Sequence, residues 1–245
     1  DASGKRSRKI TVKGKSIKDE RIYLGDFEIY RCHSGLHSGL ERKTMSLSDD
    51  KGQRYVMIDV RNNVDDGTEK ELTRFQLGNN IGSTSIELDD SAEIISYEEY
   101  HPYGTTSYQI MSRSIKAAAK RYRYTGMERD DETGLSYHTA RYYIPWLGRW
   151  LSADPIGIEG GINFYCYCLC RPNSFTDVNG TDCLYDPYTF ETICEGGPDD
   201  FDYQYLQVQN EELEQYEAYI GSGEILKDFV SEIGKGANEI IEAID

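Results

Sequence analysis

The sequence contains no run of about 18 consecutive apolar residues, so no segment is long enough to cross a membrane as a helix. Its six cysteines include no CxxC pair, which argues against a structural zinc site. The chain opens with the polar residues Asp1-Ala-Ser-Gly-Lys-Arg6 and lacks the apolar stretch of a signal peptide. From this opening we expect the sequence to be a piece of a longer chain. A membrane span, a zinc-stabilised fold and a secretory leader are therefore not expected.

Aromatic residues are used unevenly, with 20 tyrosines but only 7 phenylalanines and 2 tryptophans. Tyrosine suits a pleated surface on which the ring packs and the hydroxyl stays in water, so its excess favours β-sheet. Short runs of alternating apolar and polar residues, separated by Gly, Asn and Asp, predict antiparallel hairpins. Only 112–121 has local helical character before residue 200, and a loop is an equal alternative there. Strands are expected at 21–30, 54–60, 84–88, 93–97, 122–127, 135–144 and 162–169.

Negative charge is concentrated at the end of the chain. Residues 182–245 contain 17 Asp and Glu but only Lys227 and Lys235, a net charge of −15, whereas residues 1–181 have a net charge of −1. This step indicates two units with different roles, and the overall charge of −16 argues against nucleic acid as a partner. Helical spacing at 205–220 and 224–244, without histidine or a nucleophile–base pair, predicts an acidic helical tail with no catalysis of its own.

The cysteines suggest no ligand site. Cys166, Cys168 and Cys170 alternate along an expected strand, so they would share one buried apolar face. Disulfides between such neighbours on one strand are geometrically poor, and the redox compartment stays open. The stretch 32–37 holds one cysteine and two histidines but is rich in glycine, which favours a loop over a metal site. We expect neither a metal nor a cofactor.

Two long stretches carry a family resemblance. Residues 122–137 (YRYTGMERDDETGLSY) and 141–157 (RYYIPWLGRWLSADPIG) closely resemble the Rhs-associated core. This signature closes the YD-repeat shell in Rhs toxins and in the C component of insecticidal Tc toxin complexes. Upstream, 75–84 (FQLGNNIGST) and 97–104 (YEEYHPYG) are similar to the repeat that precedes the core. The resemblance covers about residues 20–181 and is closest to the TccC-like branch.

The resemblance implies an architecture. In that family the repeats form a spiralling β-sheet that coils into a hollow shell, and the core block plugs one end and cuts the chain. The segment behind the cut, a variable toxin, stays inside the shell. We therefore expect a mainly β fold of antiparallel hairpins closing in a core plug. Residues 1–120 would form the terminal YD-repeat strands, 121–181 the Rhs-associated core with the self-cleavage motif, and 182–245 a variable acidic passenger segment.

The resemblance also implies a cleavage site. Asp154 and Asp177 match the family's two aspartates in motif and spacing, and Arg141 occupies the position of its essential arginine. Aspartic peptide hydrolysis needs two carboxyl groups that share one proton, one acting on water and the other on the carbonyl or leaving nitrogen. A guanidinium can orient such a carboxylate through two hydrogen bonds. The implied scissile bond joins Thr181 to Asp182, where the charge step begins.

Three departures from the family pattern lie near this bond. Val178 replaces the usual proline, Thr181 replaces the usual leucine, and Cys170-Arg171-Pro172 stands where Asn-Asn-Pro is expected. Proline would stiffen the approach to the cut, and leucine would anchor in an apolar pocket. None of the departures removes a catalytic group, so they bear on the rate of cleavage more than on the capacity for it.

The expected function is a toxin shell that encloses its own C-terminal passenger and releases it by single-turnover aspartic autoproteolysis after Thr181. A Tc B-type shell partner or an SpvB-like region would accompany it, in a secreted toxin complex or as a delivered effector. The alternative is a structural or adhesive YD-repeat scaffold that does not cleave. In that case Asp154 and Asp177 would be turn residues and Arg141 a salt-bridge partner at a strand edge.

Overall fold

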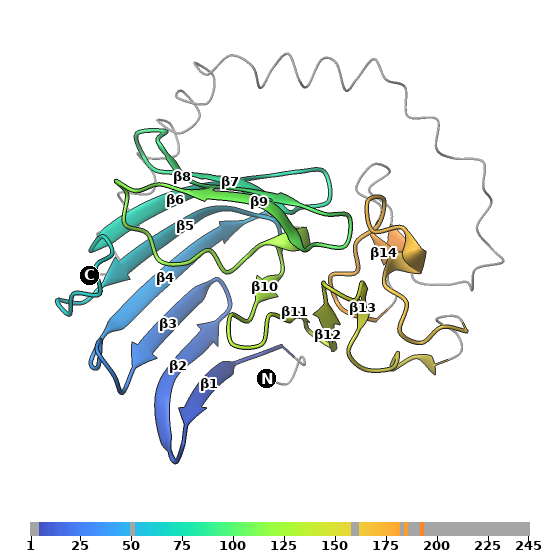
Figure 1. The fold of residues 1–245 in the computed structure, drawn as a ribbon, viewed down its shortest axis with the longest axis horizontal. Helices are drawn as coiled ribbons and strands as arrows, with labels where there is room; N and C mark the ends of the chain where they lie inside the picture. Colours follow the sequence, from blue (N-terminus) through green and yellow to red (C-terminus); the bar gives the residue numbers. More distant parts are fainter. Residues whose placement is uncertain (1–4, 50–51, 158–161, 182–183, 186–191, 194–245) are drawn as a thin grey trace.

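The computed structural model describes residues 5–49, 52–157, 162–181, 184–185 and 192–193. Nine strands pair in the order of the sequence, each antiparallel to the next, so the main sheet is an up-and-down meander (Figure 1). The strands are β1 (Arg8–Lys13), β2 (Ser16–Leu24), β3 (Phe27–Cys32), β4 (Glu41–Ser48), β5 (Arg54–Arg61), β6 (Glu71–Gly78), β7 (Thr84–Leu88), β8 (Ile94–Tyr100) and β9 (Thr106–Met111).

The hairpins follow from local turn chemistry. The runs expected at 54–60, 84–88 and 93–97 are confirmed as β5, β7 and β8. The single strand expected over 21–30 is wrong, because a two-residue turn at Gly25-Asp26 divides it into the ends of β2 and β3. Gly25 has a φ of +69°, a conformation that glycine adopts without steric cost and that tight hairpin turns require.

A second, smaller sheet lies on the concave side of the curved main sheet (Figure 1). It consists of β10 (Glu128–Arg129), β11 (Ser136–His138), β12 (Arg141–Ile144) and β13 (Arg149–Trp150), again antiparallel and in sequence order. The run expected at 135–144 is therefore strand, interrupted by one turn. Residues 112–121, which lead from β9 toward this sheet, form an irregular segment, so the loop alternative is confirmed and the helix is wrong.

The main sheet has one apolar and one polar buried face. Successive residues of a strand point to opposite faces. In β5 the buried Val56, Ile58 and Val60 share one face, and Met57 and Asp59 share the other. On the polar face Glu98 lies 2.9 Å from Lys120 Nζ, and Arg74 donates a 2.8 Å hydrogen bond to the Ala118 carbonyl. Buried charges persist where they are paired. Ion pairs therefore fix the segment before β10 on the polar face. The apolar cluster consists of Val56, Ile58, Val60, Phe75 and Leu88.

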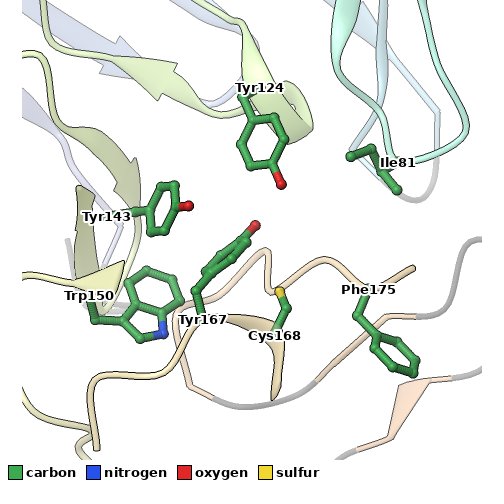
Figure 2. Packing of buried hydrophobic residues seen from close by; sticks show 7 residues of the cluster. All are labelled: Ile81, Tyr124, Tyr143, Trp150, Tyr167, Cys168 and Phe175. Carbon is green, nitrogen blue, oxygen red and sulfur yellow. The ribbon is translucent and has the colours of Figure 1, made fainter. Parts of the chain in front are cut away.

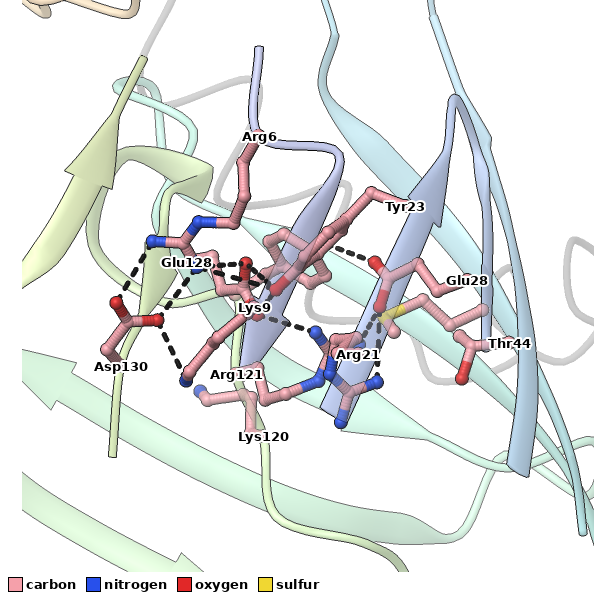
Figure 3. Close-up of polar contacts among 12 residues, drawn as sticks. Arg6, Lys9, Arg21, Tyr23, Glu28, Thr44, Lys120, Arg121, Glu128 and Asp130 are labelled. Atoms are coloured by element: carbon pink, nitrogen blue, oxygen red, sulfur yellow. Dashed lines mark hydrogen bonds and ion pairs between the residues drawn. The ribbon is translucent and has the colours of Figure 1, made fainter. Parts of the chain in front are cut away.

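Charged side chains also join the two sheets directly (Figure 3). Arg6, just before β1, binds both carboxylate oxygens of Asp130, at 2.9 and 3.0 Å. Arg121 lies between Glu128 of β10, at 2.8 Å, and Glu28 of β3, at 2.6 Å. Burial would raise the pKa of Asp130, but its basic neighbours, Arg6 first, outweigh burial and hold that pKa below its usual value. The carboxylate is thus ionised at neutral pH and anchors the second sheet.

An aromatic core lies beside the second sheet (Figure 2). Tyr143 and Tyr167 have ring centroids 4.2 Å apart, and Trp150 meets Tyr167 edge-on at 5.2 Å. Tilted and edge-to-face contacts of this kind are favourable between aromatic rings. The full cluster consists of Ile81, Tyr124, Tyr143, Trp150, Tyr167, Cys168 and Phe175.

The strands expected at 122–127 and 162–169 are wrong. Instead the chain forms two short 3₁₀ turns, η1 (Tyr124–Gly126) and η3 (Cys168–Cys170). Both turns place a buried tyrosine, Tyr124 or the adjacent Tyr167, in the aromatic core, so tertiary packing overrides the local strand preference.

The cysteine expectation is wrong as well. Because η3 replaces the strand, Cys166, Cys168 and Cys170 do not share a buried face: Cys168 is buried, Cys166 half-buried and Cys170 exposed.

Little of the C-terminal segment belongs to the described part of the chain. Leu184–Tyr185 (β14) pairs antiparallel with Thr192–Ile193 (β15). The helices expected at 205–220 and 224–244 lie outside the described residues. Among the residues that are described, no helix combines the length and the apolar character that a membrane span requires.

Candidate active site

The three residues implied by the resemblance come from different parts of the plug. Arg141 opens β12 directly after the two-residue turn Thr139-Ala140 that follows β11. Asp154 follows β13, where its backbone N–H donates to the Phe164 carbonyl at 2.9 Å. Asp177 lies in an irregular segment, and that segment is tied to the β11–β12 turn by a 3.0 Å hydrogen bond from Ala140 N–H to the Asn179 carbonyl.

The Arg141 guanidinium lies between both carboxylates. Its Nη1 is 2.6 Å from Asp154 Oδ2, and its Nη2 is 3.3 Å from Asp177 Oδ2. The three side chains are at most 3% exposed. The guanidinium carbon also lies 4.1 Å from the Trp150 ring centroid, a favourable cation–π position. One buried cation therefore holds two carboxylates that are 23 residues apart in sequence.

The backbone before the implied scissile bond is held in the same site. Asp177 Oδ1 accepts hydrogen bonds from the N–H groups of Gly180, at 2.7 Å, and Thr181, at 3.3 Å. The Gly180 carbonyl accepts a 2.7 Å hydrogen bond from Arg141 Nε. Thr181 is thus next to the carboxylate pair, while Asp182 lies outside the described residues.

Gly180 is a site residue that sequence reasoning named only as part of a motif. Its φ is +69°, and a Cβ atom there would lie 2.6 Å from the His138 carbonyl oxygen and 3.0 Å from the Arg141 nitrogen. Both atoms belong to the backbone and cannot rotate away. Only glycine lets the 177–181 segment approach the β11–β12 turn this closely.

His138 was missed entirely by the sequence analysis. Its side chain is completely buried, and Nδ1 lies 2.6 Å from the Asp177 carbonyl oxygen. Since a carbonyl only accepts, Nδ1 carries the proton. The ring meets Trp150 edge-on at a centroid distance of 5.1 Å. Its Nε2 is buried without a hydrogen-bond partner among the described residues. The available signal was its position opposite Arg141 across the hairpin.

The buried position of His138 makes protein stability sensitive to pH. Burial lowers the pKa of His138 to about 4, and the positive charge of Arg141 adds to this effect, while the hydrogen bond to the Asp177 backbone opposes it. In the unfolded chain the histidine has an ordinary pKa of about 6.5. Between pH 4 and 6.5 the unfolded chain therefore binds a proton on this ring that the folded protein does not bind. Above pH 6.5 the ring is therefore neutral in both states and its titration does not affect stability, whereas His138 costs stability as the pH falls toward 4.

We predict that wild type loses about 3 kcal/mol of unfolding free energy between pH 6.5 and 4 relative to His138→Asn, which has no titrating ring. Urea unfolding at several pH values measures the difference in slope. His101→Asn, at an exposed histidine, is the control and should follow wild type. Parallel pH profiles for wild type and His138→Asn would show that the buried ring does not control this dependence.

The geometry brings Arg141, Asp154 and Asp177 together. It is compatible with a catalytic role and also with the alternative, in which the aspartates are turn residues and Arg141 is their salt-bridge partner. Asp154 Oδ1 accepts a 3.0 Å hydrogen bond from the Ile156 N–H, as a turn aspartate does, while Oδ2 faces Arg141. Asp177 combines the same two roles. Elsewhere, within the part of the chain that the structure describes, no group of three or more His, Cys, Asp or Glu residues could hold a metal ion.

Comparison with known proteins identifies relatives among toxin subunits. No family model matches the sequence. The toxin subunit YenC2 of Yersinia entomophaga is 33% identical over 183 residues, which is 74% of this chain and 19% of the relative. YenC1 of the same organism is 44% identical over 107 residues, 44% of this chain and 11% of the relative. The chain thus spans a fifth or less of these curated relatives.

The fold has counterparts among solved structures. The crystal structure of TcdB2-TccC3 aligns with a TM-score of 0.64 and 31% sequence identity, covering 73% of this chain and 9% of that chain. A Photorhabdus luminescens Tc holotoxin pore aligns with a TM-score of 0.64 and 28% identity over 79% of this chain and 9% of that chain. Together with the mainly antiparallel β architecture and the core signature at 122–157, these relatives show that the chain belongs to the Rhs/YD-repeat toxin proteins and is similar to the C component of Tc toxin complexes.

Proposed function

We propose that the chain is the C-terminal part of a Tc-type toxin shell that encloses its own C-terminal passenger and cuts itself once, after Thr181. The observation that carries this proposal is the Arg141 guanidinium between two buried carboxylates, with the backbone of 180–181 bound to the same groups. A substrate segment held this way reacts as part of the same molecule, which removes the entropic cost of bringing it to the site.

The charge balance of the site supports aspartic chemistry. Arg141 supplies one positive charge against the two carboxylates of Asp154 and Asp177, all three buried. A single proton shared by the carboxyl groups would neutralise the excess negative charge, which is otherwise costly in a buried site. The ionised carboxylate then takes a proton from water, and the water oxygen adds to the Thr181 carbonyl carbon. The protonated carboxyl group donates to the nitrogen of Asp182 as the Thr181–Asp182 bond breaks, which leaves a carboxyl group on Thr181 and an amino group on Asp182.

The proposal extends to the three parts of the chain and to its partner. Residues 1–120 would be the terminal strands of the shell, 121–181 the core with the cleavage site, and 182–245 the passenger. The solved relatives include complexes of TccC3 with TcdB2, which supports a B-type shell partner for this chain and a secreted or delivered toxin complex as its setting.

Mass spectrometry of the expressed chain tests the cleavage. The wild-type chain should yield a fragment that begins at Asp182, whereas Asp154→Asn and Asp177→Asn should give only the uncut chain, since an amide cannot exchange the proton. Asp26→Asn, at an exposed turn aspartate, is the control and should be cut like wild type.

An uncut wild type that matches Asp154→Asn would favour the scaffold alternative, in which Arg141 only locks the plug. Because the chain spans 19% of its relative YenC2, the same comparison is also made with this chain as part of a longer protein, in which further shell strands would surround the site.

A further inference from the structure

The segment 166–170, between β13 and Asp177, brings two thiols together. Cys166 Sγ and Cys170 Sγ lie 3.0 Å apart, four residues apart in sequence. Bonded sulfurs lie about 2.0 Å apart, so each side chain would need to move only about half an ångström to close the bond. The geometric objection to a cross-link along a flat strand does not apply here, because the chain turns through η3 between the two residues.

The backbone enclosed by these two residues is strained. Cys168, Leu169 and Cys170 have φ values of +48°, +50° and +61°, three consecutive left-handed residues without a glycine. Each such residue costs conformational free energy because its Cβ crowds the following carbonyl oxygen. Strained backbone persists where the surroundings over-determine it. Packing of Tyr167 and Cys168 in the aromatic core supplies part of this restraint (Figure 2).

We propose that Cys166 and Cys170 form a disulfide that closes the left-handed turn. The third cysteine of the segment is unsuited to the role: Cys168 is buried in the aromatic core, where burial raises the pKa of its thiol and keeps it protonated. Cys170 is exposed and Cys166 half-buried, so both can be reached from solvent.

The cross-link forms by thiol–disulfide exchange with a small disulfide such as oxidised glutathione. The Cys170 thiolate, after losing its proton to solvent, attacks one glutathione sulfur and expels the other as a thiolate. The Cys166 thiolate then attacks the Cys170 sulfur, which forms the protein disulfide and releases the second glutathione. Two protein thiols and one small disulfide thus become one protein disulfide and two small thiols.

The cross-link would hold the wall of the candidate active site. The Cys168 thiol lies beside the Asp177 backbone, so the turn that the disulfide closes packs directly against one of the two carboxylate residues. The proposal does not depend on cleavage, however, because all three cysteines precede Thr181 and remain in the same fragment whether or not the chain is cut.

Differential alkylation tests the disulfide. The chain is incubated with oxidised glutathione, alkylated under denaturing conditions without reductant, and digested with a protease that cuts after acidic residues. The fragment 160–177 contains these three cysteines and no others. We expect one alkyl group, on Cys168, and two further groups on Cys166 and Cys170 only after reduction.

Three alkyl groups before reduction would overturn the proposal, as would pairing of either thiol with Cys168, Cys183 or Cys194. Cys166→Ser is the matched control: without the second thiol, Cys170 should carry one glutathione or an alkyl group, and no disulfide should form inside the fragment. Oxidation should also raise the thermal midpoint of wild type by roughly 5 °C and leave that of Cys166→Ser unchanged.

Discussion

Replacing Arg141 with methionine is expected to lower the unfolding free energy by about 3–5 kcal/mol and to abolish cleavage at Thr181–Asp182. Methionine fills most of the space, but it leaves Asp154 and Asp177 buried without their shared positive charge. Removing one partner of a buried ion pair costs more than the pair itself contributes, because the remaining charge stays desolvated. Here the negative charge that the two carboxyl groups share would be left buried without its cation.

Arg141→Lys separates charge from geometry: it keeps the cation but loses the fork that reaches Asp154, Asp177 and the Gly180 carbonyl at once, so it should recover part of the stability and little of the cleavage.

Arg149→Met, at an exposed arginine of β13, is the surface control and should change stability by about 0.5 kcal/mol or less. Urea unfolding and fragment mass measure the two effects. Equal losses for Arg141→Met and Arg149→Met would contradict the central role of the buried guanidinium.

Substituting alanine for Gly180 is expected to slow cleavage by about 100-fold or more, because small displacements of reacting groups have effects of this size. The added Cβ would lie 2.6 Å from the His138 carbonyl oxygen, so the 177–181 segment must move away from the β11–β12 turn. That movement breaks the hydrogen bonds of Gly180 with Asp177 and Arg141.

Gly157→Ala is a close control for this prediction. Gly157 has a φ of +72°, nearly that of Gly180, but a Cβ atom there would have no heavy atom within 4 Å. Both variants therefore carry the strain of a left-handed alanine, and only Gly180→Ala carries the backbone clash. Time courses of fragment release compare the two, and equal rates would show that close approach at Gly180 is not required.

Local signals account for part of the main sheet, since β1, β4, β6 and β9 were not predicted. Alternating runs bounded by Gly, Asn and Asp predicted β5, β7 and β8, because each strand is half of a hairpin whose turn is also local. The error at 21–30 has the same origin: Gly25-Asp26 is itself a turn signal, yet it lies inside an alternating run that continues across it.

Local sequence signals predict less of the plug, because its structure depends on contacts between residues that are distant in the sequence. The runs 122–127 and 162–169 have strand-like composition, but Tyr124 and Tyr167 reach the aromatic core only through turns with left-handed residues. The strand preference of a residue largely reflects how its side chain packs against its neighbours in a sheet. A prediction from that preference fails where contacts outside a sheet decide the backbone conformation.

The candidate site was predicted through family resemblance and not through spacing. Asp154 and Asp177 lie in irregular segments, and nothing local brings them to Arg141. His138 was missed because a single histidine in a short strand has no motif; only its pairing opposite Arg141 across the β11–β12 turn places it beside Asp177.

The most direct test of self-cleavage is a mixing experiment. Purified uncut chain is made to cleave at several protein concentrations, alone and with a mass-tagged Asp177→Asn chain as a second substrate. We predict a first-order rate that is independent of concentration, a new N-terminus at Asp182, and no cleavage of the tagged variant. A rate that rises with protein concentration, or cleavage of the tagged Asp177→Asn chain by wild type, would contradict an intramolecular reaction at Arg141, Asp154 and Asp177.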